Sequence, residues 1–178
     1  MYGRSKLEEV ANALVHLPFV VISIYYIFSS NTNLVFFICS SLTFFLSTVY
    51  HIEKDGRSKK LLRRCDVASI FWLIPASVFH LLPIHLASFL MLLCIVLSVP
   101  VVKSETSLVF TDVALITTAV ACTALGCLFS ESWLSICAGV LLYALGLPFY
   151  FSSYTKWAHF VWHIFVAGGW SIHASIYM

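Results

Sequence analysis

Charged side chains are scarce in this sequence. Only 10% of its 178 residues are Asp, Glu, Lys or Arg, whereas 61% are hydrophobic. A water-soluble domain needs far more polar surface than this composition supplies, because its whole exterior meets water. The scarcity excludes a soluble domain and indicates an all-α integral membrane protein whose apolar exterior meets lipid.

The sequence also lacks C-x-x-C pairs, and we expect no cleavable signal peptide in it. Five of its six cysteines lie within long apolar runs, and Cys65 stands at an expected helix start. We interpret them as small residues that face lipid or core, and we predict no disulfide. Glu8 and Glu9 precede the first apolar run, which is longer than a signal core and has no small-residue cleavage site. We therefore expect that run to be a membrane span.

Apolar runs of spanning length fill the chain. A spanning helix needs about 20 mostly apolar residues, so seven of them would use about 140 residues and leave only short loops. Charged and turn residues divide the chain into seven expected spans, at about residues 10–28, 34–52, 66–82, 84–102, 108–129, 134–151 and 158–177. The sequence predicts a single domain, residues 1–178, that folds as a seven-transmembrane-helix bundle.

Basic residues are missing from every second expected loop. All ten lie before the first span or between spans two and three, four and five, or six and seven: Arg4, Lys6, Lys54, Arg57, Lys59, Lys60, Arg63, Arg64, Lys103 and Lys156. Lysine and arginine accumulate on the cytoplasmic side of membrane proteins. We therefore expect a cytoplasmic N-terminus, an external C-terminus and a multi-pass protein of the plasma (inner) membrane.

Several ionisable residues lie where lipid makes them costly, and such residues mark functional sites by default. His159 and His163 are four residues apart, so they share one helix face at the spacing that two imidazoles need to bind one metal ion. His51 lies in the last turn of the second span, and Asp66 lies in the first turn of the third. The expected orientation places all four at the cytoplasmic face. Three histidines with an open fourth position are typical of a catalytic zinc site, where the metal acidifies bound water.

Two residues near this predicted site have alternative interpretations. Asp66 could take a proton from the water or orient it, but it could also be an N-terminal helix residue favoured by the helix dipole or a partner of Arg63 or Arg64. Ser47 precedes His51 by four residues and could hydrogen-bond the water or a substrate carbonyl. Spacing alone favours a hydrogen bond from Ser47 to its own helix.

Other polar residues extend along the spans. Asn12 and His16 share a face of the first span with Glu8, which predicts an inward polar strip of either structural or functional importance. We interpret His173 as a hydrogen-bonded residue of the bundle interior. Asp112, one turn into the fifth span, is either a second polar contributor or a residue that reaches the interface.

The order and spacing of these residues carry a family resemblance. Residues 8–16 contain E-x-x-N-x-x-x-H, residues 47–51 are S-x-x-x-H, residues 61–74 combine a basic segment, Asp66 and an aromatic run, and a final block extends from residue 139 to residue 173. This pattern resembles the hemolysin III family, which is grouped with the progestin and adipoQ receptors and the alkaline ceramidases. The resemblance implies a zinc ion near the cytoplasmic face with His51, His159 and His163 as ligands, Asp66 holding the metal-bound water and Ser47 beside it.

The chain departs from that pattern in three places. It is short for the family and lacks the soluble N-terminal region of the receptor branch, which argues against hormone reception. Val67 follows Asp66 where an imidazole or tyrosine is usual, and Leu17 and Pro18 follow His16 where glycine is common. None of these departures affects an expected ligand.

The leading hypothesis is a zinc-dependent hydrolase that cleaves a ceramide-like lipid amide or ester near the cytoplasmic leaflet. Its expected partners are membrane lipids and not nucleic acid, and no sequence pattern specifies an oligomer. One alternative is a pore-forming hemolysin-like protein, which is disfavoured because a pore needs a polar stripe through the full bilayer and the polar groups gather mainly at one face. The other is a non-enzymatic sensor with a structural zinc, a site normally closed by a fourth protein ligand.

Overall fold

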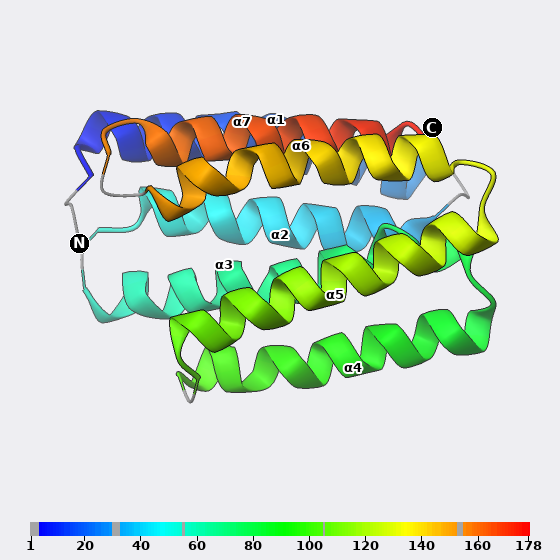
Figure 1. The fold of residues 1–178 in the computed structure, drawn as a ribbon. Helices are drawn as coiled ribbons and strands as arrows, with labels where there is room; N and C mark the ends of the chain where they lie inside the picture. The colour runs from blue at the N-terminus through cyan, green and yellow to red at the C-terminus, as the bar shows by residue number, and fades with distance from the viewer. Residues whose placement is uncertain (1–3, 30–32, 55, 105, 153–154) are drawn as a thin grey trace.

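Seven α-helices and one short 3₁₀ helix make up most of the residues that the computed structural model describes, which are 4–29, 33–54, 56–104, 106–152 and 155–178. They are α1 (Lys6–Ser29), α2 (Leu34–Ile52), α3 (Arg57–Ala76), η1 (Phe79–Leu81), α4 (Ile84–Lys103), α5 (Leu108–Phe129), α6 (Trp133–Phe151) and α7 (Ala158–Ala174). The α-helices run alternately in opposite directions (Figure 1). The predicted all-helical class is confirmed.

The helices pack as a ring with one flanking member. Each of α1, α2 and α3 packs against the next, α5 lies against α3 and α6, and α6 packs along α7. The ring closes because α7 also packs against α1, while α4 lies outside it against α3 (Figure 1). The first and last helices are therefore neighbours, and α7 is brought to the side of the bundle that α1 and α2 form.

The outer surface suits a membrane. Among the described residues, five helices are long and apolar enough to cross one, namely α1, α2, α4, α5 and α6. Large apolar side chains stand out from these helices, and Phe28 and Leu128 are 87% and 78% exposed. Lipid accepts such side chains, whereas their contact with water is unfavourable. The chain is a membrane protein. Of the other two helices, α3 begins with a charged segment and α7 has only 17 residues.

Two helices begin and end where the sequence predicts. The bounds of α2 and α5 are the expected 34–52 and 108–129. Both start at a residue whose side chain caps the helix, because Asn33 accepts a hydrogen bond from the Phe36 amide and Ser107 accepts one from the Phe110 amide. A side-chain oxygen at this position satisfies an amide that would otherwise lack a partner.

The start of α3 differs from the prediction. The helix begins at Arg57, nine residues before the expected start of the third span. The basic segment is rich in lysine, arginine and leucine, which are good helix formers, so it continues the helix and forms no loop. Asp66 therefore lies inside α3. Its expected place in the first turn is wrong, and with it the interpretation of Asp66 as an N-terminal residue favoured by the helix dipole.

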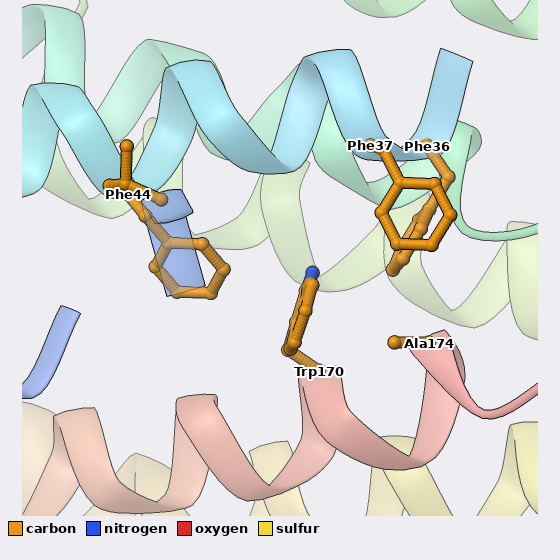
Figure 2. Packing of buried hydrophobic residues seen from close by; sticks show 6 residues of the cluster. Phe36, Phe37, Phe44, Trp170 and Ala174 are labelled. Carbon is orange, nitrogen blue, oxygen red and sulfur yellow. The ribbon is translucent and has the colours of Figure 1, made fainter. Parts of the chain in front are cut away.

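A buried aromatic cluster fixes α7 against α2. It consists of Val20, Phe36, Phe37, Phe44, Trp170 and Ala174. Figure 2 shows Trp170 pointing from α7 towards α2, between Phe44 on one side and Phe36 and Phe37 on the other. The ring centroids of Trp170 and Phe44 are 5.6 Å apart, and the indole Nε1 donates a hydrogen bond of 2.7 Å to Ser40 Oγ. These contacts set the register of the two helices.

This register brings distant histidines together. His51 follows Phe44 by seven residues, and His163 precedes Trp170 by seven. Because α2 and α7 run in opposite directions (Figure 1), both steps move about two turns, or about 10.5 Å, towards the same end of the bundle. The contact between Phe44 and Trp170 therefore aligns His51 with His163.

Small residues bring α6 and α7 close together. A Cβ atom on Gly139 would lie 2.3 Å from the His173 ring, and a Cβ on Gly169 would lie 2.5 Å from the Tyr143 ring. Glycine at such contacts lets two membrane helices approach more closely than a larger residue would. His173 Nε2 donates to the carbonyl oxygen of Ile136 at 3.2 Å. This hydrogen bond confirms the interpretation of His173 as a residue of the bundle interior.

Candidate metal centre

Three imidazoles converge at one end of the bundle. His51 comes from the last turn of α2, and His159 and His163 come from the first two turns of α7. One ring nitrogen of each lies within 4.8 Å of those of the other two, and His51 Nε2 and His163 Nε2 are 3.0 Å apart. In a tetrahedral zinc site with Zn–N bonds of 2.0–2.1 Å, neighbouring nitrogens are about 3.3 Å apart. The three rings thus need only small shifts to bind one ion.

Glu9 orients the His51 ring. The Glu9 carboxylate accepts a hydrogen bond of 2.6 Å at Oε2 from His51 Nδ1. A carboxylate only accepts hydrogen bonds, so the ring proton lies on Nδ1 and the lone pair of Nε2 points into the site. Lys59 Nζ donates to the other oxygen, Glu9 Oε1, at 2.9 Å. Glu9 therefore joins α1 to α2 and α3 and leaves His51 Nε2 able to bind a metal ion.

Glu8 fixes the start of the helix that carries the other two histidines. Its Oε1 accepts a hydrogen bond of 2.8 Å from the backbone amide of Trp157, and its Oε2 accepts two from Ser5. Trp157 is the N-cap of α7 and adopts a left-handed backbone conformation with φ of 65°. Because Trp157 precedes His159 by two residues, this contact sets the position of His159 relative to α1.

Asn12 and His16 bring further polar groups to the site. Both residues are buried, and among the described residues neither the Asn12 amide nor either His16 nitrogen has a hydrogen-bond partner. The His16 ring centroid is 4.2 Å from that of His163, although His16 does not belong to the group of three imidazoles. Buried polar groups normally have partners. These atoms are therefore available to a polar molecule bound beside the imidazoles.

Ser47 and Asp66 face each other across α2 and α3. The Ser47 hydroxyl lies near the Asp66 carboxylate, although it makes no hydrogen bond of ordinary geometry within the described residues. The hydrogen bond from Ser47 to its own helix, favoured by spacing alone, is not formed. The Asp66 carboxylate does not belong to the group of three imidazoles. The structure thus brings His51, His159 and His163 together, with Ser47 one turn before His51 on α2 and Asp66 outside the group.

Asp112 has a partner on the neighbouring helix. Its Oδ1 accepts a hydrogen bond of 3.2 Å from the Tyr150 hydroxyl, which links α5 to α6. This contact favours the interpretation of Asp112 as a polar contributor within the bundle. It does not belong to the group of three imidazoles either.

The residues of the site fit a divalent transition-metal ion. Imidazole nitrogens suit Zn, Cu, Fe and Ni, and thiolates are not needed for such a site. His159 Nδ1 and His163 Nδ1 have no hydrogen-bond partner among the described residues, so no hydrogen bond at these atoms holds either ring turned away from the site. The hydrogen bond from a metal-binding histidine to a carboxylate is a common supporting contact of metal sites, and His51 and Glu9 supply it.

No protein-family model, curated protein or solved structure matches this chain. A function for this chain is therefore inferred from the geometry of the site and from the residue pattern.

Proposed function

We propose that this chain is a zinc-dependent membrane hydrolase of the hemolysin III type, which cleaves the amide or ester bond of a ceramide-like lipid near the cytoplasmic leaflet. The observation that carries the proposal is the convergence of three imidazoles from two helices. His51 and His163 are 112 residues apart in sequence, and their Nε2 atoms are 3.0 Å apart. Three histidine donors favour zinc among the imidazole-binding metals when one coordination position stays open.

We also propose a number of membrane spans and an orientation for the bundle. All seven α-helices cross the membrane, and the end that holds the three imidazoles faces the cytoplasm. The support is the charge pattern, because the loops at the other end contain no lysine or arginine. The 17 residues of α7 would rise about 26 Å, close to the hydrocarbon thickness of about 30 Å. This orientation places the site beside the inner leaflet of the plasma membrane.

The residues around the imidazoles have distinct proposed roles. Bound zinc supplies Lewis acidity, which polarises a carbonyl group and activates water at neutral pH. Glu9 keeps His51 in the tautomer that leaves Nε2 free. The Asp66 carboxylate accepts the proton that the attacking water loses, and the Ser47 hydroxyl donates a hydrogen bond to the substrate carbonyl oxygen. The Ser47 hydroxyl makes no hydrogen bond of ordinary geometry among the described residues, so it is available to substrate.

Two observations favour a hydrolase over the alternatives. A structural zinc in a sensor is normally closed by a fourth protein ligand, and neither His16 nor Asp66 belongs to the group of three imidazoles. A pore through the bundle would need a wet path beyond the site. Instead the aromatic cluster around Trp170 packs tightly between α1, α2 and α7.

Metal analysis of the purified protein tests the site. We expect zinc at close to one ion per chain in the unaltered protein and its loss in the variant His163→Ala, since this substitution removes a ligand. The matched control is His85→Ala, which alters an exposed histidine at the start of α4 and should keep its zinc. Unchanged zinc in His163→Ala would refute the metal centre.

Activity on defined lipids tests the reaction. We expect the zinc-loaded protein to release fatty acid from a ceramide-like lipid in detergent micelles, and Asp66→Asn to lower the rate by about 10²–10⁴-fold with its zinc retained, because it lacks the proton acceptor. Asp112→Asn is the matched control, since Asp112 bonds Tyr150. A zinc-loaded protein that releases fatty acid from neither amide nor ester lipids would refute the hydrolase and support the sensor.

A further inference from the structure

Two cysteine sulfurs are in contact at the other end of the bundle. Cys127 lies near the end of α5 and Cys137 lies near the start of α6, ten residues further along the chain. Their Sγ atoms are 3.5 Å apart. The sequence shows two cysteines in separate apolar runs and gives no reason to pair them. The short connection between α5 and α6 places them side by side.

The pair is close enough to form a covalent bond. A disulfide bond is about 2.05 Å long, so the sulfurs must approach by about 1.5 Å. Rotation about the two Cα–Cβ bonds moves the sulfurs without moving either helix. Cys137 is exposed and Cys127 is half-buried, within about one turn of the helix ends. A small thiol or disulfide reagent can therefore reach the pair at the membrane boundary.

The position of the pair favours oxidation. The connection between α5 and α6 lies at the end of the bundle opposite the start of α1 and the end of α2 (Figure 1), and the last turn of α2 carries His51. The loops at this end contain no lysine or arginine, so the proposed topology places it outside the cytoplasm. Extracytoplasmic compartments are where disulfides form and persist. This compartment assignment rests on the orientation given under the proposed function, whereas the proximity of the sulfurs does not.

We propose that Cys127 and Cys137 form a reversible disulfide that joins α5 to α6. The thiolate of the exposed Cys137 attacks a disulfide donor of the glutathione type, and one thiol of the donor leaves. The Cys127 thiolate then attacks the Cys137 sulfur of this mixed disulfide, and the second thiol leaves. In total the two cysteines lose two electrons and two protons, and the donor disulfide is reduced to two thiols.

The bond would reinforce the least supported part of the ring. α5 packs against α3 and α6 in the ring, and only its side chains meet those of α4, its neighbour in sequence. α6 packs against α7, which carries His159 and His163. A covalent link between α5 and α6 therefore ties α5 to the helix pair that carries the site. We expect oxidation to raise the unfolding temperature of the protein by several degrees.

Titration of the purified protein with oxidised and reduced glutathione tests the pair. Free thiols are blocked with N-ethylmaleimide, the protein is reduced, and newly released thiols are labelled with a heavy maleimide and located by peptide mass spectrometry. We expect Cys127 and Cys137 to become labelled together, and the single variants Cys127→Ser and Cys137→Ser to lose both the label at the remaining partner and the rise in unfolding temperature. Cys39→Ser, the matched control, should behave like the unaltered protein.

Two results would overturn the proposal, and they are distinguishable. If neither sulfur is protected at any glutathione ratio, the pair does not form a disulfide, whatever the orientation of the chain. If the pair oxidises in the glutathione titration but is fully reduced in cells treated with N-ethylmaleimide before lysis, the assignment to an oxidising compartment is wrong. Neither result alters the zinc content of the protein, so the metal centre is tested separately.

Discussion

Replacing Glu9 by glutamine tests whether the imidazoles act as metal ligands. The Glu9 carboxylate binds His51 Nδ1 at 2.6 Å and Lys59 Nζ at 2.9 Å. Glutamine has nearly the same size, so the packing around the side chain is preserved. The substitution removes the negative charge and leaves a neutral amide oxygen as the acceptor for the His51 ring. The amide nitrogen of glutamine cannot accept a hydrogen bond, so one of the two donors, His51 Nδ1 or Lys59 Nζ, loses its own acceptor.

The magnitude follows from the role of the contact. Removing a supporting hydrogen bond of a metal-binding histidine weakens metal affinity by about 10–100-fold, which is about 1.4–2.7 kcal/mol. The short distance and the charge of the carboxylate place Glu9 towards the upper part of this range, because charge-assisted hydrogen bonds are about twice as strong as neutral ones. We therefore expect Glu9→Gln to bind zinc with an affinity lower by close to two orders of magnitude.

The measurement is a competition titration of the purified protein against a chelator of known zinc affinity. Glu53→Gln is the matched control, because Glu53 is an acidic residue at the same end of α2 whose backbone carbonyl, and not its carboxylate, binds Lys59. Equal zinc affinities for Glu9→Gln and the unaltered protein, together with loss of zinc in His163→Ala, would show that Glu9 does not support a ligand. The short contact would then be an ion pair of structural importance only.

Two further predictions concern the packing that positions the site. Gly139→Ala should lower the stability of the protein by about 1–3 kcal/mol, because the new Cβ would meet the His173 ring at 2.3 Å. Gly168→Ala, which meets only the tip of a leucine side chain at 3.2 Å, should cost much less, and thermal unfolding in detergent compares the two. Trp170→Phe should weaken the fold by about 1–2 kcal/mol and also loosen zinc binding, because it removes the hydrogen bond to Ser40 and leaves that hydroxyl buried without a partner. A variant of Trp170 that unfolds at a lower temperature but binds zinc normally would contradict the idea that this contact sets the register of the histidines.

The helices were predictable where polar loops and caps punctuate the apolar runs. Residues 34–52 and 108–129 are bounded by Asn33 and Ser107, whose side chains cap the helices in the structure. The start of α3 could not be predicted in the same way. The charge of this segment predicts a loop between two spans, but at the membrane boundary lysine and arginine reach water from within a helix. The helix therefore continues back to Arg57.

The site was predictable in part, for a physical reason. His159 and His163 share a helix face by their spacing alone, and the charge pattern places His51 at the same end of the bundle. Lateral contacts between helices have no such signal. Glu9 contacts a residue 42 positions away and Trp157 donates to Glu8 across 149 positions. Which helices are neighbours depends on how the ring closes, and periodicity within one helix does not determine that closure.

Because the ring closes, α1 contacts both α2 and α7, the two helices that carry the imidazoles. The apolar composition of α1 does not indicate this role. Its inward face carries Glu8, Asn12 and His16 at successive turns, and all three are buried. Polar groups inside a membrane bundle are costly unless they have hydrogen-bond partners. At the start of α1, the partners come from the two helices that carry the imidazoles. Glu9, beside the strip, binds the end of α2, and Glu8 binds the start of α7. Neither contact can form unless α1 is docked, so α1 helps to position the three imidazoles without supplying any of them. Asn12 and His16 continue the strip along α1, and their polar atoms have no partner among the described residues. They lie on the same face of α1 as Glu8. We therefore regard α1 as the helix that aligns the three imidazoles of the candidate metal centre.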